Sequence, residues 1–232
     1  MIRRFRLTWP DRRPFVGRDG RPIRFLAASD DADPALEHEV NRAALGPIDA
    51  VIGCGDLEPH WLSFLADAFH APLVFVRGNH DRGVAWKARD STMPVPLGAG
   101  DSARLEGIAI AGLEWPGVRE PGNERRDGLA WAHVLRVALR AFGATLRGRT
   151  EPLLVISHVP PAGAGDSASD AYHVGFSAYR WLMDRLRPPL WLHGHTAIAS
   201  VGSLETVVGQ TTLVNVTGAV LVELVPPDGG TG

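Results

Sequence analysis

Leu73-Val74-Phe75-Val76-Arg77-Gly78-Asn79-His80-Asp81 is a stretch in which an apolar run leads directly into polar, chemically active side chains. Four consecutive apolar residues are typical of a short buried strand, and a glycine soon after them favours a sharp turn. In α/β proteins, ligands bind beyond the carboxyl ends of the strands. We therefore expect Asn79 and His80 to lie at a ligand-binding edge.

The pattern of a strand followed by a metal-capable side chain recurs along the chain. It comprises Asp30 after 23–28, Asp56 after 48–53, His158 after 153–157, and His193 and His195 after 190–192. Singly, Asp30 fits a helix cap, Asp56 a turn residue and His158 a hydrogen-bonded, half-buried histidine. Their repeated position after strands favours instead one mixed oxygen and nitrogen site for a hard or borderline divalent metal.

Helical patterns alternate with these strands, which is typical of α/β proteins. We expect helices over residues 34–44, 60–69, 128–146 and 176–186. We also expect a hairpin over 103–111 and closing antiparallel strands over 206–225. The sequence thus predicts an α/β fold in which mixed sheets are flanked by helices.

The chain divides into three parts. One domain is expected over residues 22–225. Residues 1–21 carry turn signals at Gly17 and at Asp19-Gly20, and we expect them to form an appended β-hairpin. Residues 226–232 are rich in proline and glycine and are expected to be disordered, and the polar, glycine-rich loop 163–169 is expected to be mobile.

The composition excludes several classes of protein. Hydrophobic residues make up 45% of the 232 residues and charged residues 22%, so the chain is globular rather than disordered. A formal net charge of -2 gives no sign of a nucleic-acid surface. With one cysteine, no signal peptide and no apolar run of membrane-spanning length, we expect a cytoplasmic protein of unknown oligomeric state.

A known family shares these motifs. Taken together, Asp30, Gly55-Asp56, Gly78-Asn79-His80-Asp81, Ser157-His158 and His193-Gly194-His195 resemble the motifs of the calcineurin-like metallophosphoesterase superfamily. The resemblance covers about residues 22–225. It implies a four-layer α/β/β/α sandwich with two metal ions at the strand edge between the two sheets.

The resemblance implies metal-binding roles for six residues. Asp56 would bridge the two metals, Asn79, His158 and His193 would complete one site, and Asp30 and His195 would serve the other. Two metals about 3.5–4 Å apart can hold an attacking hydroxide and neutralise charge on a phosphoryl group.

Two further residues would take part in catalysis by the same resemblance. His80 would face the substrate and stabilise or protonate the leaving oxygen. Asp81 would orient His80, as a carboxylate fixes the tautomer of an imidazole.

One position departs from the family pattern. The first motif normally reads Asp-x-His, but Ala32 stands at the histidine position. Asp31, Asp33 or water could fill the vacancy, giving a site richer in oxygen that favours manganese or magnesium over zinc. Alternatively, the first metal binds only together with substrate, or the fold has lost catalysis and serves binding.

The sequence therefore predicts a metal-dependent phosphoesterase that uses a metal-bound hydroxide to hydrolyse a small-molecule phosphate ester. A phosphodiester, including nucleotides, is favoured over a monoester, because a chain of 232 residues leaves little room for a capping domain. Two divalent metal ions are expected, with Mn²⁺ favoured over Fe, Zn²⁺ or Mg²⁺. A catalytically silent binding or scaffold protein on the same fold is the alternative.

Three residues have open interpretations. Arg77 either contacts substrate phosphate or is a surface arginine at a strand end. His173 opens a predicted helix and is a candidate for substrate contact. Cys54 fits a small buried residue better than a thiol with redox or metal sensitivity.

Overall fold

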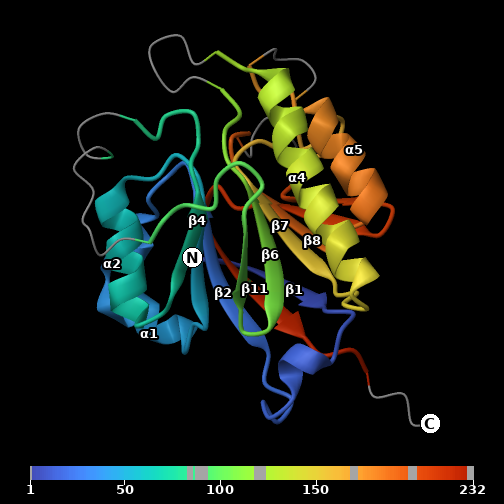
Figure 1. The fold of residues 1–232 in the computed structure, drawn as a ribbon. Coiled ribbons are helices and arrows are strands. Elements are labelled where there is room, and N and C mark those ends of the chain that lie inside the picture. Colours follow the sequence, from blue (N-terminus) through green and yellow to red (C-terminus); the bar gives the residue numbers. More distant parts are fainter. Residues whose placement is uncertain are drawn as a thin grey trace.

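The computed structural model describes residues 2–82, 86, 94–117, 124–167, 172–197 and 203–228. These residues form two mixed β-sheets that face each other, and helices cover both outer faces (Figure 1). Three clusters of buried apolar side chains fill the spaces between the four layers. The predicted α/β fold with a four-layer sandwich is confirmed.

The first sheet has five strands in the order β1 (Arg3–Thr8), β11 (Gly218–Val225), β2 (Ile23–Ser29), β3 (Ala50–Cys54) and β4 (Leu73–Val76). β2, β3 and β4 run parallel, whereas β11 is antiparallel to β2. Along β2, Phe25 and Ala27 belong to the cluster between the sheets, and Leu26 and Ala28 to the cluster under the helices. Both faces of the strand are buried, which explains its continuous apolar run.

The second sheet has six strands in the order β5 (Ser102–Leu105), β6 (Ile108–Leu113), β7 (Leu153–Ser157), β8 (Leu190–His193), β10 (Thr211–Asn215) and β9 (Glu205–Val208). The four inner strands run parallel, and β5 and β9 pair antiparallel at the two edges. Asp56 follows β3 and His158 follows β7, and their side chains touch. The carboxyl ends of the parallel strands of both sheets therefore meet at one edge.

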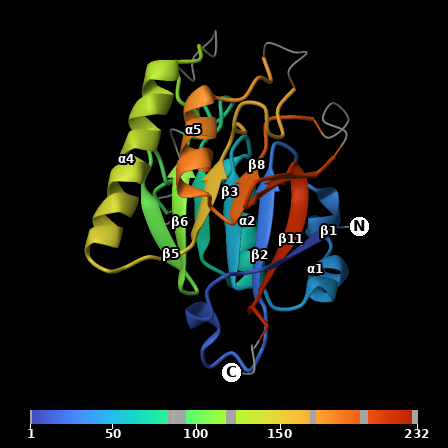
Figure 2. The same cartoon turned by 90° about the vertical axis from the view of Figure 1, so that its right-hand side faces the viewer.

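Four α-helices form the outer layers of the described chain. α1 (Glu39–Leu45) and α2 (Pro59–Phe69) cover the first sheet, and α4 (Asp127–Leu146) and α5 (Ser177–Leu186) cover the second (Figure 2). No helix of the described chain has both the length and the apolar character needed to cross a bilayer.

The helix predicted over 34–44 is divided in the structure. A 3-10 helix spans Pro34–Glu37, His38 is extended, and α1 begins at Glu39. The guanidinium of Arg42 donates hydrogen bonds of 2.7 Å to the carbonyl groups of Leu36 and Glu37. These carbonyls are therefore satisfied without a continuous helix.

The β-hairpin predicted for residues 1–21 is not formed. Residues 3–8 make β1, which pairs parallel with β11, and a second 3-10 helix spans Arg13–Phe15. The physical reason is apolar burial, because Phe5, Trp9 and Phe15 are buried in the cluster between the sheets. An isolated hairpin would leave these side chains in water.

The strands predicted over 206–225 are divided between the two sheets. β9 and β10 pair antiparallel in the second sheet, but the chain then crosses to the first sheet, where β11 pairs with β2. Of the two segments expected to be mobile or disordered, residues 168–169 of the loop and 229–232 of the tail lie outside the described residues.

Candidate metal centre

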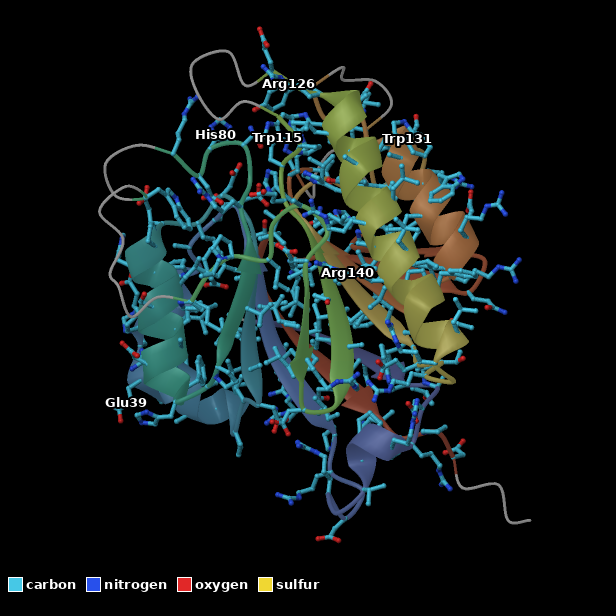
Figure 3. All side chains as sticks on the ribbon, viewed as in Figure 1. Glu39, His80, Trp115, Arg126, Trp131 and Arg140 are labelled. Atoms are coloured by element: carbon cyan, nitrogen blue, oxygen red, sulfur yellow. The ribbon has the colours of Figure 1, made fainter. Side chains whose placement is uncertain are left out.

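The described strand ends bring carboxylate, amide and imidazole groups together at one edge. Asp30 directly follows β2, Asn79 lies three residues beyond β4, and His158 directly follows β7. Figure 3 labels His80 at this loop-bearing end of the sandwich, near Trp115. Asp30, Asp56 and His158 each offer one ligand atom within 4.8 Å of the other two.

The Nε2 atom of His158 lies at the middle of this group. It is 2.8 Å from Oδ1 of Asn79, 3.2 Å from Oδ2 of Asp56 and 3.2 Å from Nδ1 of His195. The other ring nitrogen, Nδ1, donates to the carbonyl oxygen of Cys54 at 3.0 Å. This bond to the end of β3 fixes the ring and directs Nε2 at the three polar neighbours.

The electrostatics of the group favour a positive charge at this point. Burial alone would lower the pKa of His158, but Asp56 and, more weakly, Asp30 raise it to about 9. Asp56 is largely buried, which opposes its ionisation, yet His158 holds the pKa of this carboxyl below its usual value. Without a metal, a proton on His158 is thus stabilised by the surrounding oxygens.

Burial lowers the pKa of the two remaining histidines among the candidate ligands, His193 and His195. Burial lowers the pKa of His195 to about 3, and the nearby charge of His158 adds to this shift. Burial likewise lowers the pKa of His193 to about 4. A neutral imidazole has a lone pair available for a metal ion, so these rings need not lose a proton on binding.

Asp30 and His195 are joined across the two sheets. The backbone N–H of His195 donates to both carboxylate oxygens of Asp30, at 2.9 and 3.2 Å. The hydroxyl of Thr217 donates to Oδ2 of Asp30 at 3.1 Å. Asp30 is therefore held by the second sheet on one side and by the segment before β11 on the other.

Three non-glycine residues of the site have left-handed backbone conformations. The φ angles are 61° at Asp30, 57° at Asp56 and 67° at His195. Such conformations cost free energy and persist only where the surrounding structure enforces them. All three occur where a strand ends and its polar side chain turns toward the edge between the sheets.

Glycines allow the loops of the site to approach one another. A Cβ atom on Gly194 would overlap the hydroxyl of Ser29 and the carboxylate of Asp30. A Cβ atom on Gly78 would overlap the carboxylate of Asp56. The glycines beside the polar residues in the sequence are thus required by close packing.

Asp81 supports the backbone of the loops rather than the ring of His80. Its Oδ2 atom accepts hydrogen bonds from the N–H groups of Asp56, at 2.9 Å, and Gly78, at 2.6 Å. Burial raises the pKa of Asp81 to about 6. The sequence-based interpretation paired Asp81 with the His80 ring, and the structure instead directs this carboxylate to the backbone after β3 and β4.

The ring of His80 has a partner that the sequence did not reveal. The hydroxyl of Tyr172 lies 3.2 Å from Nε2 of His80 and accepts a hydrogen bond of 2.5 Å from the side-chain amide of Asn79. The backbone carbonyl of Tyr172 is 3.1 Å from Nε2 of His195. His80 itself is exposed, and its backbone N–H donates a hydrogen bond of 2.7 Å to Oδ1 of Asp56.

The remaining predicted residues have different surroundings. His193 is buried, with Nδ1 3.1 Å from the carbonyl oxygen of Gly194, and is outside the compact group formed by Asp30, Asp56 and His158 among the described residues. The ring of His173 lies 5.1 Å from that of His195, at the edge of the site. The guanidinium of Arg77 donates to the carbonyl oxygen of Asp81 and lies over the ring of Trp86.

The segment around Ala32 contains no substitute carboxylate at the centre. Ala32 and Asp31 are exposed. The carboxylate of Asp33 accepts a 2.9 Å hydrogen bond from the N–H of Ala35 and caps the 3-10 helix. Asp33 therefore has a local structural role.

The donor set fits a divalent cation. Carboxylate oxygens, an amide oxygen and neutral imidazole nitrogens are ligands of hard and borderline metals. Asp56 and Asp30 already stabilise a positive charge on the ring of His158, because they outweigh its burial and raise the pKa of His158 to about 9. A metal ion bound there would replace this proton.

Comparison with known proteins gives one family and several similar structures. The family model described as calcineurin-like phosphoesterase matches residues 30–199. The crystal structure of TT1561 from Thermus thermophilus has a TM-score of 0.59 at 17% identity, covering 85% of this chain and 90% of that one. A dimetal phosphatase from Danio rerio has a TM-score of 0.51 at 11% identity, covering 85% and 88%. A search of curated protein sequences finds no match.

Proposed function

Because this chain belongs to the calcineurin-like phosphoesterase family, we propose that it is a metal-dependent phosphoesterase that hydrolyses a small-molecule phosphodiester in preference to a monoester. The observation that carries the proposal is the shell around Nε2 of His158, made of Asp56, Asn79 and His195. This shell combines residues from both sheets and gathers donors of the types that divalent metals bind.

The proposed ligands come from both sheets. They are Asp30, Asp56, Asn79, His158, His193 and His195, and Asp56 would be the carboxylate shared by two metal ions. Divalent metal ions bound there would activate water and neutralise charge on the phosphoryl group. Mn²⁺ is favoured, because Ala32 leaves the Asp30 side of the site with one imidazole fewer than the family pattern.

His80 is the proposed general acid. Its side chain is exposed, whereas the ligands around it are buried or half-buried, so an incoming substrate can reach the ring. The hydroxyl of Tyr172 contacts both Nε2 of His80 and the amide of Asn79, and this shared contact supports a position of the imidazole beside the proposed ligands. A proton from His80 would leave with the alcohol or nucleoside portion of the ester.

Asp81 has a supporting role in this proposal. Its carboxylate holds the N–H groups of Asp56 and Gly78, so it fixes the loops that carry the bridging ligand and His80. Arg77 braces the same loop through the carbonyl of Asp81. His173 lies beside His195 and is proposed to contact the substrate.

The borders of the site support the proposed preference for a diester. The two sheets and their helices account for the described elements, and no separate capping domain occurs among them. A diester has a substituent on each side of the phosphorus and needs an open edge on both sides.

The decisive experiment compares an aryl phosphodiester with the matching aryl phosphomonoester. Protein stripped with a chelator is refilled with Mn²⁺, Mg²⁺ or Zn²⁺, and hydrolysis is measured against Asp56→Ala. With Mn²⁺, we expect the turnover of the parent protein to be well above that of Asp56→Ala. We also expect the diester to be hydrolysed faster than the monoester. Faster monoester turnover would refute the diester preference alone, and turnover equal to that of Asp56→Ala would refute the phosphoesterase.

A metal-poor binding protein is the second candidate, and Ala32 is the observation that favours it. In that case, the refilled protein should hold less than one metal ion per chain and should hydrolyse neither ester. Restoring the family histidine with Ala32→His then distinguishes the two cases. Tighter metal binding in this variant indicates that the missing histidine limits the metal affinity of the site. Unchanged metal affinity indicates that another group already supplies this ligand.

A further inference from the structure

The outer face of α4 exposes a row of large apolar side chains. The exposed fractions are 38% for Trp131, 47% for Leu135, 69% for Leu139, 61% for Phe142 and 73% for Leu146. These five residues, here called the α4 stripe, recur every three or four positions and lie on one side of the helix. With a rise of 1.5 Å per residue, the stripe is about 22 Å long.

The α4 stripe is not needed to pack the helix on its own sheet. The opposite face of α4 buries Ala130, Val134 and Val137 in the cluster above the second sheet. The two charged residues within the span of the stripe, Arg136 and Arg140, both contact Asp101. α4 is therefore apolar on two faces. At one end of the outer face, Trp131 packs edge-on against Trp181 of α5, with ring centroids 5.7 Å apart, and the other four side chains of the stripe are exposed in the described part of the chain.

The exposed area is of the size of a protein interface. One tryptophan, one phenylalanine and three leucines at these fractions expose roughly 500–600 Å² together, which equals the largest apolar patches of ordinary monomers. Two copies placed face to face would bury about 1,000–1,200 Å², which reaches the lower limit of specific interfaces. A second copy of the chain supplies the required area without any other partner.

The spacing of the stripe suits a two-fold antiparallel pair. In such a pair, Trp131 of one copy lies opposite Leu146 of the other, Leu135 opposite Phe142, and Leu139 close to the other Leu139. The steps of four, four, three and four residues are nearly the same in both directions. A symmetric dimer needs a surface that complements itself in this way.

The helix dipoles favour the same arrangement, because antiparallel pairing opposes the two dipoles. The charged side chains do not select a direction, since arginines lie at both ends of α4. Arg125 and Arg126 precede the helix, where Arg125 pairs with Asp127 at 3.0 Å, and Arg147 and Arg149 follow its last residue. The net charge of -2 gives little attraction to an anionic lipid surface.

We propose that this protein forms a symmetric dimer in which the α4 stripes of two copies pair antiparallel. Figure 3 labels Trp131 and Arg140 on α4, on the outer layer of the sandwich. The strand-end edge with the metal ligands is formed by other elements, so the dimer does not depend on the proposed function.

The first test measures mass in solution. Sedimentation velocity or light scattering of the full chain, over about 1–100 μM, should give a mass that rises to twice that of one chain. The double variant Leu139→Glu with Phe142→Glu should stay monomeric over this range. Val40→Glu is the matched control, because Val40 is an exposed apolar residue on α1 with an exposed fraction of 75%, and it should dimerise like the parent.

The second test fixes the direction of pairing. Cys54 is buried, so a cysteine introduced on α4 is the accessible thiol of the described chain. Under mild oxidation, Leu139→Cys should give a disulfide-linked dimer, whereas Leu146→Cys should not. Cross-linking of both variants would indicate parallel pairing and overturn the proposed arrangement.

Three other results would overturn the proposal. The parent chain could be monomeric at all concentrations. Alternatively, the double variant could dimerise as strongly as the parent. The parent chain could also remain monomeric and sediment with vesicles of anionic phospholipid, with this binding lost in the double variant. That last result would assign the α4 stripe to a membrane surface.

Discussion

At the scale of single residues, the candidate centre is organised by one imidazole. His158 is fixed by a carbonyl of the first sheet and surrounded by Asp56, Asn79 and His195. The sequence predicted all four residues, because each follows a strand. It did not reveal Tyr172 or Thr217, whose contacts to the site join residues 93 and 187 positions apart. No local spacing pattern can indicate such contacts.

Replacing His80 should separate catalysis from metal binding. The ring of His80 contacts Tyr172 and is not part of the shell around His158, so His80→Ala should retain the metal content of the parent chain. Loss of a general acid should lower turnover about 10²–10⁴-fold. Metal content by mass spectrometry and initial rates check both points, with Asp56→Ala expected to lose metal and activity together. Unchanged turnover in His80→Ala would refute its role as acid.

Cys54 should be inert toward thiol reagents in the folded protein. Its side chain is buried, and this burial raises the pKa of the thiol well above its usual value. The reactive thiolate is therefore scarce at pH 8. A colourimetric disulfide reagent should label the native chain far more slowly than the chain in denaturant, while Val40→Cys supplies an exposed thiol that reacts at once. Equal rates for native and denatured protein would contradict the buried assignment.

At the scale of elements, short apolar runs in the sequence predicted the positions of most strands. The bounds of β4 and β7 agree with the apolar runs at 73–76 and 153–157, because polar or turn-forming residues flank them. Prediction failed where long-range contacts decide the structure. β1 finds its partner more than 200 residues away, and Arg42 satisfies carbonyls that a longer helix would have used. The separation of β10 and β11 into different sheets likewise has no local signal.

A methyl group at Gly194 should disturb the contact between the loops after β2 and β8. A Cβ atom there would overlap Ser29 and Asp30, so these loops would have to separate. Gly194→Ala should therefore weaken metal binding at least tenfold and destabilise the fold by about 1–3 kcal/mol. Gly128→Ala is the control, because a Cβ atom on this helical glycine would meet nothing within 4 Å. Isothermal titration with Mn²⁺ and denaturant unfolding compare the two variants, and equal metal affinities would contradict the expected clash.

At the scale of the whole molecule, the two sheets share the candidate metal centre. Ligands after β2, β3 and β4 belong to the first sheet, and those after β7 and β8 to the second. A metal ion bound between them would therefore join two layers that otherwise contact mainly through apolar side chains. The sequence predicted this meeting of the two sheets through the family resemblance, whereas apolar periodicity alone gave the strands without their pairing.

Metal binding should raise the thermal stability of the complete fold. At a free metal concentration about 100 times the Kd, binding to the native state adds about 2.7 kcal/mol to the free energy of unfolding. For a chain of this length, that corresponds to an increase in Tm of roughly 5–10 °C. Calorimetry of chelator-treated protein with and without Mn²⁺ measures the change. Asp56→Ala should show no increase, and a parent Tm that Mn²⁺ leaves unchanged would argue against a site between the sheets.

The pairing of β1 with β11 has a consequence for the order in which the protein is made. Arg3 donates to the carbonyl oxygens of Asn215 and Thr217, and Thr217 in turn holds Asp30. At a ribosomal rate of about 5–20 residues per second, the first strand waits on the order of 10–40 s for its partner. Asp30 therefore acquires its last support only after Thr217 and β11 have been made, so a nascent chain that ends before residue 217 cannot complete this side of the centre.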